Sequence, residues 1–308
     1  MRHFFNVYAR VLTILYIPIS YFCSMSYFNR GSGPQTQPIV KNLIIINVLM
    51  VLAQTALATK NIDLGEYLGL HYWQSPKFRW WQIFTHMFMH GSANDIGLTV
   101  QHIFFNMFGL WMFGNMLERI WGPKRFLLFY LVCGLGAALC HMGVLTFEFN
   151  RLFNELQVYQ QHPGYNEFAA FLSKHGLQMG DTILDHTEEM QKLLTIKDTP
   201  QFINETIDII HRYYLSALNT NMVGASGAVF GILFGFAYLF PNTELYIMFI
   251  PIPVKAKWAV TGYAAIELFS GIGAVKGDNI AHFAHLGGML FAFILLSIWK
   301  RTNRNDFY

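Results

Sequence analysis

Residues 222–240 read MVGASGAVFGILFGFAYLF and contain no charged side chain. A helix needs roughly 20 mostly apolar residues to cross the hydrocarbon core of a bilayer, and this segment satisfies that requirement with modest tolerance. Glycine recurs every fourth residue at Gly227, Gly231 and Gly235, which is typical of helices that pack closely inside a membrane. The segment therefore predicts a transmembrane helix in close contact with its neighbours.

The composition of the whole chain indicates a polytopic membrane protein. Of its 308 residues, 54% are hydrophobic and only 13% are charged, whereas a soluble domain has roughly 25% charged residues. Six segments meet the length requirement, at about 42–58, 100–117, 126–147, 222–240, 258–274 and 279–299. We therefore expect an all-α fold, a six-helix transmembrane bundle, with a helical insert between the third and fourth core spans.

Basic residues predict the orientation of this bundle. They lie after the second, fourth and sixth segments, at Arg119, Lys124, Arg125, Lys255, Lys257, Lys300, Arg301 and Arg304. With six spans, all of these positions fall on one side of the membrane, which the positive-inside rule makes cytoplasmic. The net charge of +3 and the lack of a long basic run give no reason to expect nucleic acid as a partner.

The chain divides into five parts on this basis. They are an N-terminal apolar extension and linker (1–39), core spans one to three with the first loop (40–147), an extracytoplasmic polar insert (148–221), core spans four to six (222–300) and a cytoplasmic tail (301–308). The amphipathic stretches EFNRLFNELQVY and HTEEMQKLL predict a helical hairpin or cap in the insert, which is interpreted as a solvated spacer without activity of its own. The apolar run 11–28 is expected in the interface or outside the functional unit, with a further span as the alternative.

A serine lies at the start of the fourth segment, in the sequence Gly224-Ala225-Ser226-Gly227. The flanking glycines leave little bulk around its hydroxyl, and a helix N-terminus offers free N–H donors and the positive end of the helix dipole. Such a setting suits the oxyanion that forms when a serine attacks a carbonyl carbon. Taken alone, the glycine pattern is more typical of helix packing than of catalysis.

The sixth segment contains NIAHFAHLGG over residues 279–288, with two histidines in an apolar span. Small residues recur there every four positions, at Ala284, Gly288 and Ala292. This small-residue stripe can dock against the glycines of the fourth segment. Close docking would bring a short serine side chain within reach of an imidazole.

Helical geometry favours His285 over His282 as that imidazole. Successive residues advance by about 100°, which places His285 nearer to the centre of the small-residue stripe. We expect His285 to act as general base for Ser226. No acidic residue of the sixth segment is placed to orient it, which predicts a dyad and not a triad. His282 is expected near the membrane surface, bonded to a loop or to water.

The second segment carries His102 and Asn106, which are four residues apart and share one helix face. Both side chains donate hydrogen bonds, as the stabilisation of an oxyanion requires. A polar clasp between two helices is the alternative, and it is the favoured interpretation when the pair is taken alone.

Three other features are interpreted as structural. His86 and His90 have the spacing of a helical metal site, but a third ligand is missing and Met87 stands where a HExxH helix has glutamate. We expect hydrogen bonds within the loop there, and no metal. Glu267 is expected to tie the fifth span to a neighbour, with a gate or proton path as the alternative. Cysteines lie only in apolar stretches and are expected to pack, at Cys23, Cys133 and Cys140.

Taken together, these motifs resemble those of the rhomboid family of intramembrane serine proteases. The resemblance covers about residues 40–300. It rests on four motifs that occur in order: HIFFN at 102–106, Gly114-x3-Glu118-x3-Gly122, GASG at 224–227 and AHLGG at 284–288. The topology deduced from the basic residues also matches, with an active site that opens to the extracytoplasmic side.

The resemblance implies roles for particular residues. Ser226 would be the nucleophile and His285 the base, while His102, Asn106 and the backbone N–H of Ser226 would bind the oxyanion. Supporting positions are Glu118 at the cytoplasmic end of the second span, Phe230 in stacking contact with the catalytic histidine, and the motif glycines Gly224, Gly227 and Gly288. Trp81-Gln82 falls where rhomboids often have Trp-Arg, in a first loop that lies in the membrane.

We therefore expect an integral, multi-pass membrane protein that acts as a serine endopeptidase on transmembrane protein substrates. Unwinding a substrate helix costs least near helix breakers, so segments with such residues near the membrane surface are the expected substrates. The expected partners are these substrates and the lipid bilayer, with no cofactor. A bacterial inner membrane is the expected location. The alternative is a non-catalytic rhomboid-like protein that binds or escorts membrane clients, against which the presence of both serine and histidine argues.

Overall fold

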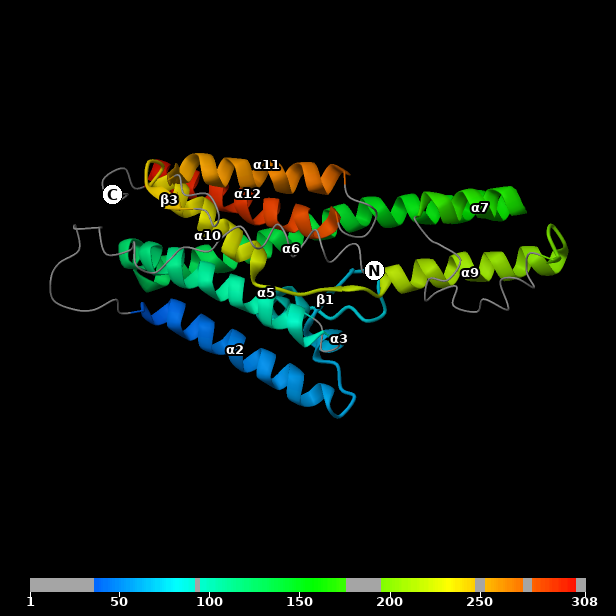
Figure 1. Cartoon of the computed structure of the whole chain (residues 1–308), viewed down its shortest axis with the longest axis horizontal. Helices are drawn as coiled ribbons and strands as arrows, with labels where there is room; N and C mark the ends of the chain where they lie inside the picture. The colour runs from blue at the N-terminus through cyan, green and yellow to red at the C-terminus, as the bar shows by residue number, and fades with distance from the viewer. Residues whose placement is uncertain (1–35, 92–94, 176–194, 247–252, 274–278, 303–308) are drawn as a thin grey trace.

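The computed structural model describes residues 36–91, 95–175, 195–246, 253–273 and 279–302. Its main helices are α2 (Pro38–Ala58), α5 (Ile96–Gly109), α6 (Asn115–Gln161), α9 (Pro200–Leu218), α10 (Ser226–Leu239), α11 (Ala256–Gly273) and α12 (Asn279–Thr302) (Figure 1). Shorter elements are α3 (Leu64–Leu68), α4 (Gln82–Thr85), η2 (His86–Phe88), the π turn η3 (Leu110–Gly114) and α7 (Tyr165–Lys174). The run 11–28 and the stretch HTEEMQKLL lie outside the described residues.

Two pairs of short antiparallel strands complete the structure. Strand β1 (Leu70–His71) pairs with β2 (Asn221–Met222), and β3 (Glu244–Tyr246) pairs with β4 (Pro253–Lys255). The first pair joins the loop after α2 to the segment that leads into α10. The expectation of an all-α membrane fold is confirmed, since these strands form only local connections.

Within the described residues, three helical stretches are long and apolar enough to cross a membrane, namely Pro38–Ala58, Ile96–Gln161 and His282–Arg301. The second stretch has 66 residues and contains two of the expected spans. They are divided at Gly122, whose φ of 76° is non-helical, with Pro123 directly after it. Helix α11 occupies the fifth expected span. The count of six crossing helices remains a prediction.

Helix α10 packs against both α6 and α12, which also contact each other, and the glycines of α10 face both neighbours. A Cβ placed on Gly227 would lie 2.3 Å from the Cβ of Ala137 on α6. A Cβ on Gly288 of α12 would lie 1.9 Å from the carbonyl oxygen of Gly227. The two small-residue stripes therefore do meet, but the stripe of α10 is shared between α12 and α6.

Helix α10 begins later than expected. The fourth span was expected over 222–240, whereas the helix begins at Ser226 and has 14 residues. Gly224 interrupts the helix because its φ of 132° lies outside the helical region. At 1.5 Å per residue the helix is about 21 Å long, shorter than the roughly 30 Å of the hydrocarbon core. A helix of this length does not reach from one surface of the hydrocarbon core to the other, so one of its ends would lie within the bilayer.

A buried carboxylate joins the second span to the first. Glu118 is 1% exposed, and its two carboxylate oxygens accept hydrogen bonds from the backbone N–H groups of Ile39 and Val40, both at 2.9 Å. These are among the unpaired donors at the N-terminus of α2, where a negative charge is stabilised by the helix dipole. The pattern Gly114-x3-Glu118-x3-Gly122 therefore serves to fix two helices at the end of the bundle.

The first loop is organised around Gln82. Its carboxamide oxygen accepts from the backbone N–H groups of His71 and Arg79, and its nitrogen donates to the carbonyl oxygens of Tyr67 and Lys77. The side chain is fully buried, and all of these contacts are neutral. Glutamine therefore anchors the loop here at the position where rhomboids often have arginine.

The insert continues the third span rather than beginning after it. Helix α6 runs without a break from Pro123 to Gln161. Residues 144–161 contain no glycine or proline, so nothing in the sequence ends the helix where the insert begins. A separate hydrophobic cluster joins the far part of α6 to α7 and α9, with Leu152, Leu156, Tyr159, Phe168, Phe171, Phe202 and Ile210 buried. The far part of α6 with α7, and α9 beside them, project beyond the bundle at the right of Figure 1. The insert is thus a helical unit with its own core.

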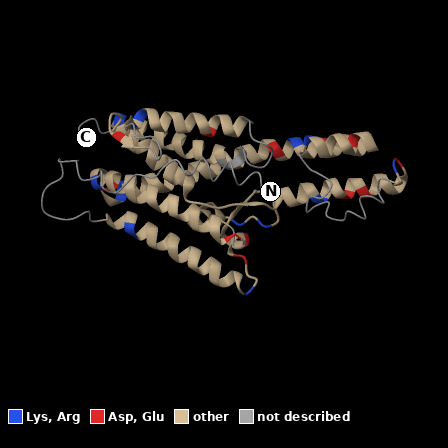
Figure 2. Cartoon of the chain, viewed as in Figure 1, with Lys and Arg blue, Asp and Glu red and all other residues tan. Residues whose placement is uncertain are grey.

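Charged residues gather at the two ends of the molecule. Figure 2 shows Lys and Arg at the left end of the bundle, around the α5–α6 turn, the β3–β4 pair and the end of α12. The apolar middle of the bundle is almost free of charge in this view. This distribution agrees with the side that the positive-inside rule makes cytoplasmic.

Candidate active site

The structure brings Ser226 and His285 together. Ser226 is the first residue of α10, and its hydroxyl lies 2.9 Å from Nε2 of His285 on α12. This distance is within the range needed for proton transfer between a nucleophile and a base. The contact depends on the close approach of the two helices, which the glycine pair Gly227 and Gly288 permits.

An aromatic ring holds the imidazole of His285 in place. The ring of Phe230, one turn after Ser226 on α10, stacks on it with centroids 4.1 Å apart and planes inclined by 4°. Tyr263 of α11 lies on the other side of Phe230, with centroids 5.0 Å apart. The expected stacking contact is therefore present, and it limits rotation of the imidazole plane.

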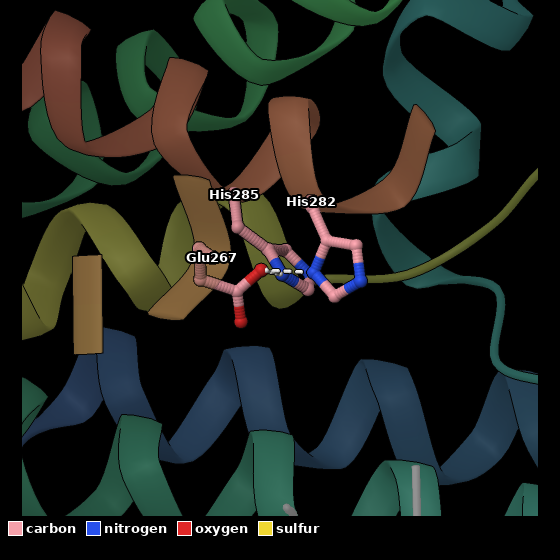
Figure 3. Close-up of side chains that lie close together, drawn as sticks. All are labelled: Glu267, His282 and His285. Carbon is pink, nitrogen blue, oxygen red and sulfur yellow. Dashed lines mark hydrogen bonds and ion pairs between the residues drawn. The ribbon is translucent and has the colours of Figure 1, made fainter. Parts of the chain in front are cut away.

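A carboxylate contacts the other nitrogen of the same imidazole. Oε2 of Glu267 on α11 lies 3.0 Å from Nδ1 of His285 and 2.6 Å from Nδ1 of His282 (Figure 3). No acidic residue of the sixth span was expected to orient His285, and the carboxylate that contacts it comes instead from the fifth span. His282 is likewise bonded to Glu267, and not only to a loop or water as expected.

Gly224 lies between Ser226 and His102, one of the residues expected to bind the oxyanion. A Cβ on this glycine would lie 3.2 Å from Cε1 of His102 and 3.4 Å from Oγ of Ser226. Gly224 therefore occupies the space between the two side chains, where any larger residue would intrude. One turn along α5, Asn106 is buried, and its amide Nδ2 has no hydrogen-bond partner among the described residues.

A small cavity of about 40 Å³ opens beside Ser226. Its lining includes the following residues from four parts of the chain: His86, Ala137, Met222, Gly224, Ser226 and His285. This volume is sufficient for water. Of the described residues, His102 and Asn106 do not line this cavity, so the structure does not unite the whole expected set around one space.

His86 was expected to bond within its loop, and it does so. Its Nδ1 lies 2.9 Å from the carbonyl oxygen of Gln82, which can only accept, so Nδ1 carries the proton. Burial lowers the pKa of His86 to about 4, and the imidazole is therefore neutral with Nε2 unprotonated. The carbonyl of His86 also accepts from the N–H of Gly224 at 2.9 Å. For His90 the same expectation is wrong: its ring nitrogens have no hydrogen-bond partner among the described residues, and the ring packs edge-on against His102, with centroids 5.2 Å apart.

Among the described residues, the donor atoms of Glu267, His282 and His285 lie close enough together to hold a metal ion. His86 and His90, the pair with metal-site spacing in the sequence, do not belong to this cluster. Glu267 was expected to tie the fifth span to a neighbour, and its contacts with α12 confirm this, but its contact with His285 in particular was not anticipated. The sequence did contain a signal for this contact. Glu267 is a lone carboxylate in an apolar span, and burying its charge costs free energy unless it has a partner.

Chemically, the arrangement contains a hydroxyl with a base, a carboxylate behind the base, and free backbone donors at the start of a helix. A carbonyl carbon placed above Ser226 would meet the requirements for attack by an activated hydroxyl. The surrounding residues are apolar, which strengthens electrostatic interactions inside the site. The geometry is therefore suited to acyl transfer.

Comparison with known proteins agrees with this geometry. The model of the Rhomboid domain matches residues 77–149 and 202–301, and the unmatched residues between these ranges belong to the insert. The chain is similar to an uncharacterised mitochondrial rhomboid protein of Schizosaccharomyces pombe, with 34% identity over 90 residues, which is 27% of this chain and 23% of the relative.

Two further relatives have similar identities over shorter segments. The rhomboid protease GluP of Bacillus subtilis is 36% identical over 56 residues, covering 18% of this chain and 10% of the relative. Mitochondrial rhomboid protein 1 of Saccharomyces cerevisiae is 35% identical over 72 residues, covering 23% of this chain and 20% of the relative. The matches thus span less than a quarter of the length of these relatives. Because the domain model itself matches more than half of the chain, this integral membrane protein belongs to the rhomboid family.

Proposed function

We propose that the protein is an intramembrane serine endopeptidase that cleaves transmembrane segments of membrane proteins. The observation that carries this proposal is the 2.9 Å contact between Oγ of Ser226 and Nε2 of His285, in a chain whose family includes a relative named as a protease. Ser226 is the proposed nucleophile and His285 the proposed general base.

The reaction follows from this arrangement. His285 takes the hydroxyl proton as Oγ of Ser226 bonds to the scissile carbonyl carbon, and the carbonyl oxygen becomes an oxyanion. The backbone N–H of Ser226, His102 and Asn106 are the proposed donors to this oxyanion. His285 then gives its proton to the leaving amine, the C–N bond breaks, and an acyl-enzyme remains. Water, activated by the same imidazole, hydrolyses the ester and releases Ser226.

The short length of α10 supports a reaction below the membrane surface. With its C-terminus at the cytoplasmic surface, a helix of about 21 Å would leave Ser226 below the opposite surface. A substrate would then present its scissile bond at that depth, unwound from its helix. Backbone groups freed in lipid are costly unless they find partners. Segments that already contain helix-weakening residues are therefore the proposed substrates, and the cavity beside Ser226 is the proposed site of the hydrolytic water.

The decisive test combines cleavage and labelling in the purified full chain. A fluorophosphonate probe reacts with an activated serine, so wild type should be labelled and should cleave a transmembrane reporter. Ser226→Ala should lose both, and His285→Ala should lose nearly all of both, while both variants stay folded in detergent. A wild-type chain that folds but is neither labelled nor active would instead favour the non-catalytic function of binding membrane clients.

The membrane in which the protein acts is a separate proposal. The matched relatives include two mitochondrial proteins and one bacterial protein. The bacterial inner membrane, with the site open to the extracytoplasmic side, therefore remains a prediction. Fusion of a reporter that is active on only one side of the membrane, placed after Arg301 or within the insert, would test the orientation.

A further inference from the structure

The carboxylate of Glu267 is shared by two histidines of the next helix. Oε2 lies 2.6 Å from Nδ1 of His282 and 3.0 Å from Nδ1 of His285 (Figure 3). The glutamate side chain is 5% exposed, and both imidazoles are largely buried. The spacing of the two histidines, three residues apart on α12, places both on the helix face that is turned towards α11.

The hydrogen-bond chemistry assigns the protons in this group. An ionised carboxylate can only accept, so Nδ1 of each histidine must carry a proton and donate. A neutral His285 with its proton on Nδ1 has a free lone pair on Nε2. That lone pair faces the hydroxyl of Ser226 at 2.9 Å, as a general base requires. The carboxylate thus selects the one neutral tautomer in which His285 can accept the serine proton.

We propose that Glu267 is a positioning residue that extends the pair to Ser226–His285–Glu267, and that His282 holds this carboxylate in place. The proposal rests on the proposed protease function. When His285 takes the proton of Ser226, it becomes an imidazolium with a carboxylate 3.0 Å from Nδ1. Opposite charges in contact stabilise each other more strongly in a buried site than in water.

His282 has a distinct part in this arrangement. A buried carboxylate that loses the hydration of its oxygens is stable only with several hydrogen bonds. His285 alone would give Glu267 one donor, and that donor changes its charge during the reaction. The second donor is Nδ1 of His282 at 2.6 Å. The proposed route from His282 to catalysis therefore runs through Glu267.

Glu267, His282 and His285 are also the three side chains that could hold a metal ion. The distances between their donor atoms favour hydrogen bonds over shared metal coordination. Ligands on a tetrahedral zinc ion with bonds of about 2.0–2.1 Å would lie about 3.3 Å apart, whereas Oε2 lies 2.6 and 3.0 Å from the two nitrogens. A metal on Nδ1 of His285 would also force the proton onto Nε2, against Ser226. Metal binding and base catalysis are therefore mutually exclusive here.

Glu267→Gln is the first test, in the full chain in detergent or vesicles. An amide can present its N–H₂ to Nδ1 and so favour the wrong tautomer of His285. We expect kcat to fall by about 100- to 10,000-fold, by analogy with amide replacement in a serine-protease triad, with KM changed by less than about threefold. Glu267→Asp should recover part of this loss. The control is Glu244→Gln, a carboxylate exposed in β3, which should retain wild-type kinetics.

A spectroscopic readout separates positioning from a merely structural role. ¹⁵N NMR of labelled histidine should show Nδ1–H for His285 in wild type and a population of Nε2–H in Glu267→Gln, because the carboxylate that selects the first tautomer is gone. Partial recovery of kcat in Glu267→Asp should be accompanied by recovery of the Nδ1–H signal.

A double-mutant cycle tests the role of His282. His282→Ala should lower kcat less than Glu267→Gln does, and it should have no further effect in the Glu267→Gln background, because it acts through that carboxylate. His211→Ala, at an exposed position of α9, is the matched control. If the losses of kcat in His282→Ala and Glu267→Gln add up in the double variant, the proposal that His282 acts through Glu267 is wrong.

The possible failures can be told apart. If Ser226→Ala is inactive but Glu267→Gln keeps wild-type kcat and the wild-type tautomer of His285, the role of Glu267 is refuted while the protease function stands. If wild type itself is neither labelled nor active, both proposals fall. If a chelator abolishes wild-type activity, and zinc restores it only when Glu267 and His282 are intact, the cluster is a metal site and the positioning role is wrong.

Discussion

Replacement of Gly288 by alanine should uncouple His285 from Ser226 without touching either residue. The added methyl group would lie 1.9 Å from the carbonyl oxygen of Gly227, whereas ordinary carbon–oxygen contacts are about 3.3–3.6 Å. Helix α12 must therefore move away from α10 by about 1.5 Å. His285 lies one turn from Gly288 and moves with it, which lengthens the 2.9 Å contact with Ser226 beyond hydrogen-bond range.

The expected effect is large on activity and smaller on stability. A displacement of about 1 Å at a reacting group can cost about 100-fold in rate, so Gly288→Ala should lower kcat by about that factor or more. Overpacking of this kind costs about 1–3 kcal/mol of stability. The assay is cleavage of a transmembrane reporter together with the rate of fluorophosphonate labelling, with thermal unfolding in detergent as the measure of folding.

Two other glycines provide matched controls for this substitution. A Cβ on Gly143 of α6 or on Gly262 of α11 would meet nothing within 4 Å, and both glycines are helical. Gly143→Ala and Gly262→Ala should therefore keep wild-type activity and gain about 0.4–1 kcal/mol in stability. Wild-type turnover in a folded Gly288→Ala variant would refute the argument that helix separation sets the distance between base and nucleophile.

Three further predictions concern other parts of the molecule. Asn106→Ala should lower kcat by about 10- to 1,000-fold with little change in KM, because an oxyanion donor acts in the transition state; a change in KM alone would make the residue structural. Gln82→Ala should destabilise the first loop by about 1–3 kcal/mol, since it leaves buried backbone groups unpaired, and faster proteolysis of that loop would report it. Replacement of residues 152–212 by a flexible linker should preserve probe labelling, because the buried cluster that it removes packs within the insert; loss of labelling in a folded variant would show that the insert shapes the site.

The sequence was informative where chemistry and helix periodicity coincide. Ser226 between glycines, a histidine beside a small-residue stripe and an aromatic residue one turn after the serine are local patterns, and the contacts that they predict are present in the structure. Their catalytic roles remain predictions. Glu118 was also recognisable, because its motif spans only one helix and the turn after it.

The contacts of Glu267 could not be predicted in the same way. They depend on how α11 is rotated about its axis relative to α12, and that rotation cannot be predicted from the sequence of either helix. The start of α10 was missed for a related reason. An apolar run is equally compatible with a helix and with an extended buried segment, so only the backbone of Gly224 and the pairing of β2 with β1 reveal that residues 222–225 are not helical.

The length of α6 has a mechanical consequence. From Pro123 to Gln161 the helix is unbroken and about 58 Å long at 1.5 Å per residue, so a bilayer core of roughly 30 Å encloses only about half of it. The enclosed half carries Ala137, against which Gly227 rests. Helix α6 therefore connects the insert directly to the bundle, because α7 and α9 pack on its outer end. A force on that end would be transmitted along an unbroken helix to Ala137, and so to the start of α10 at Ser226.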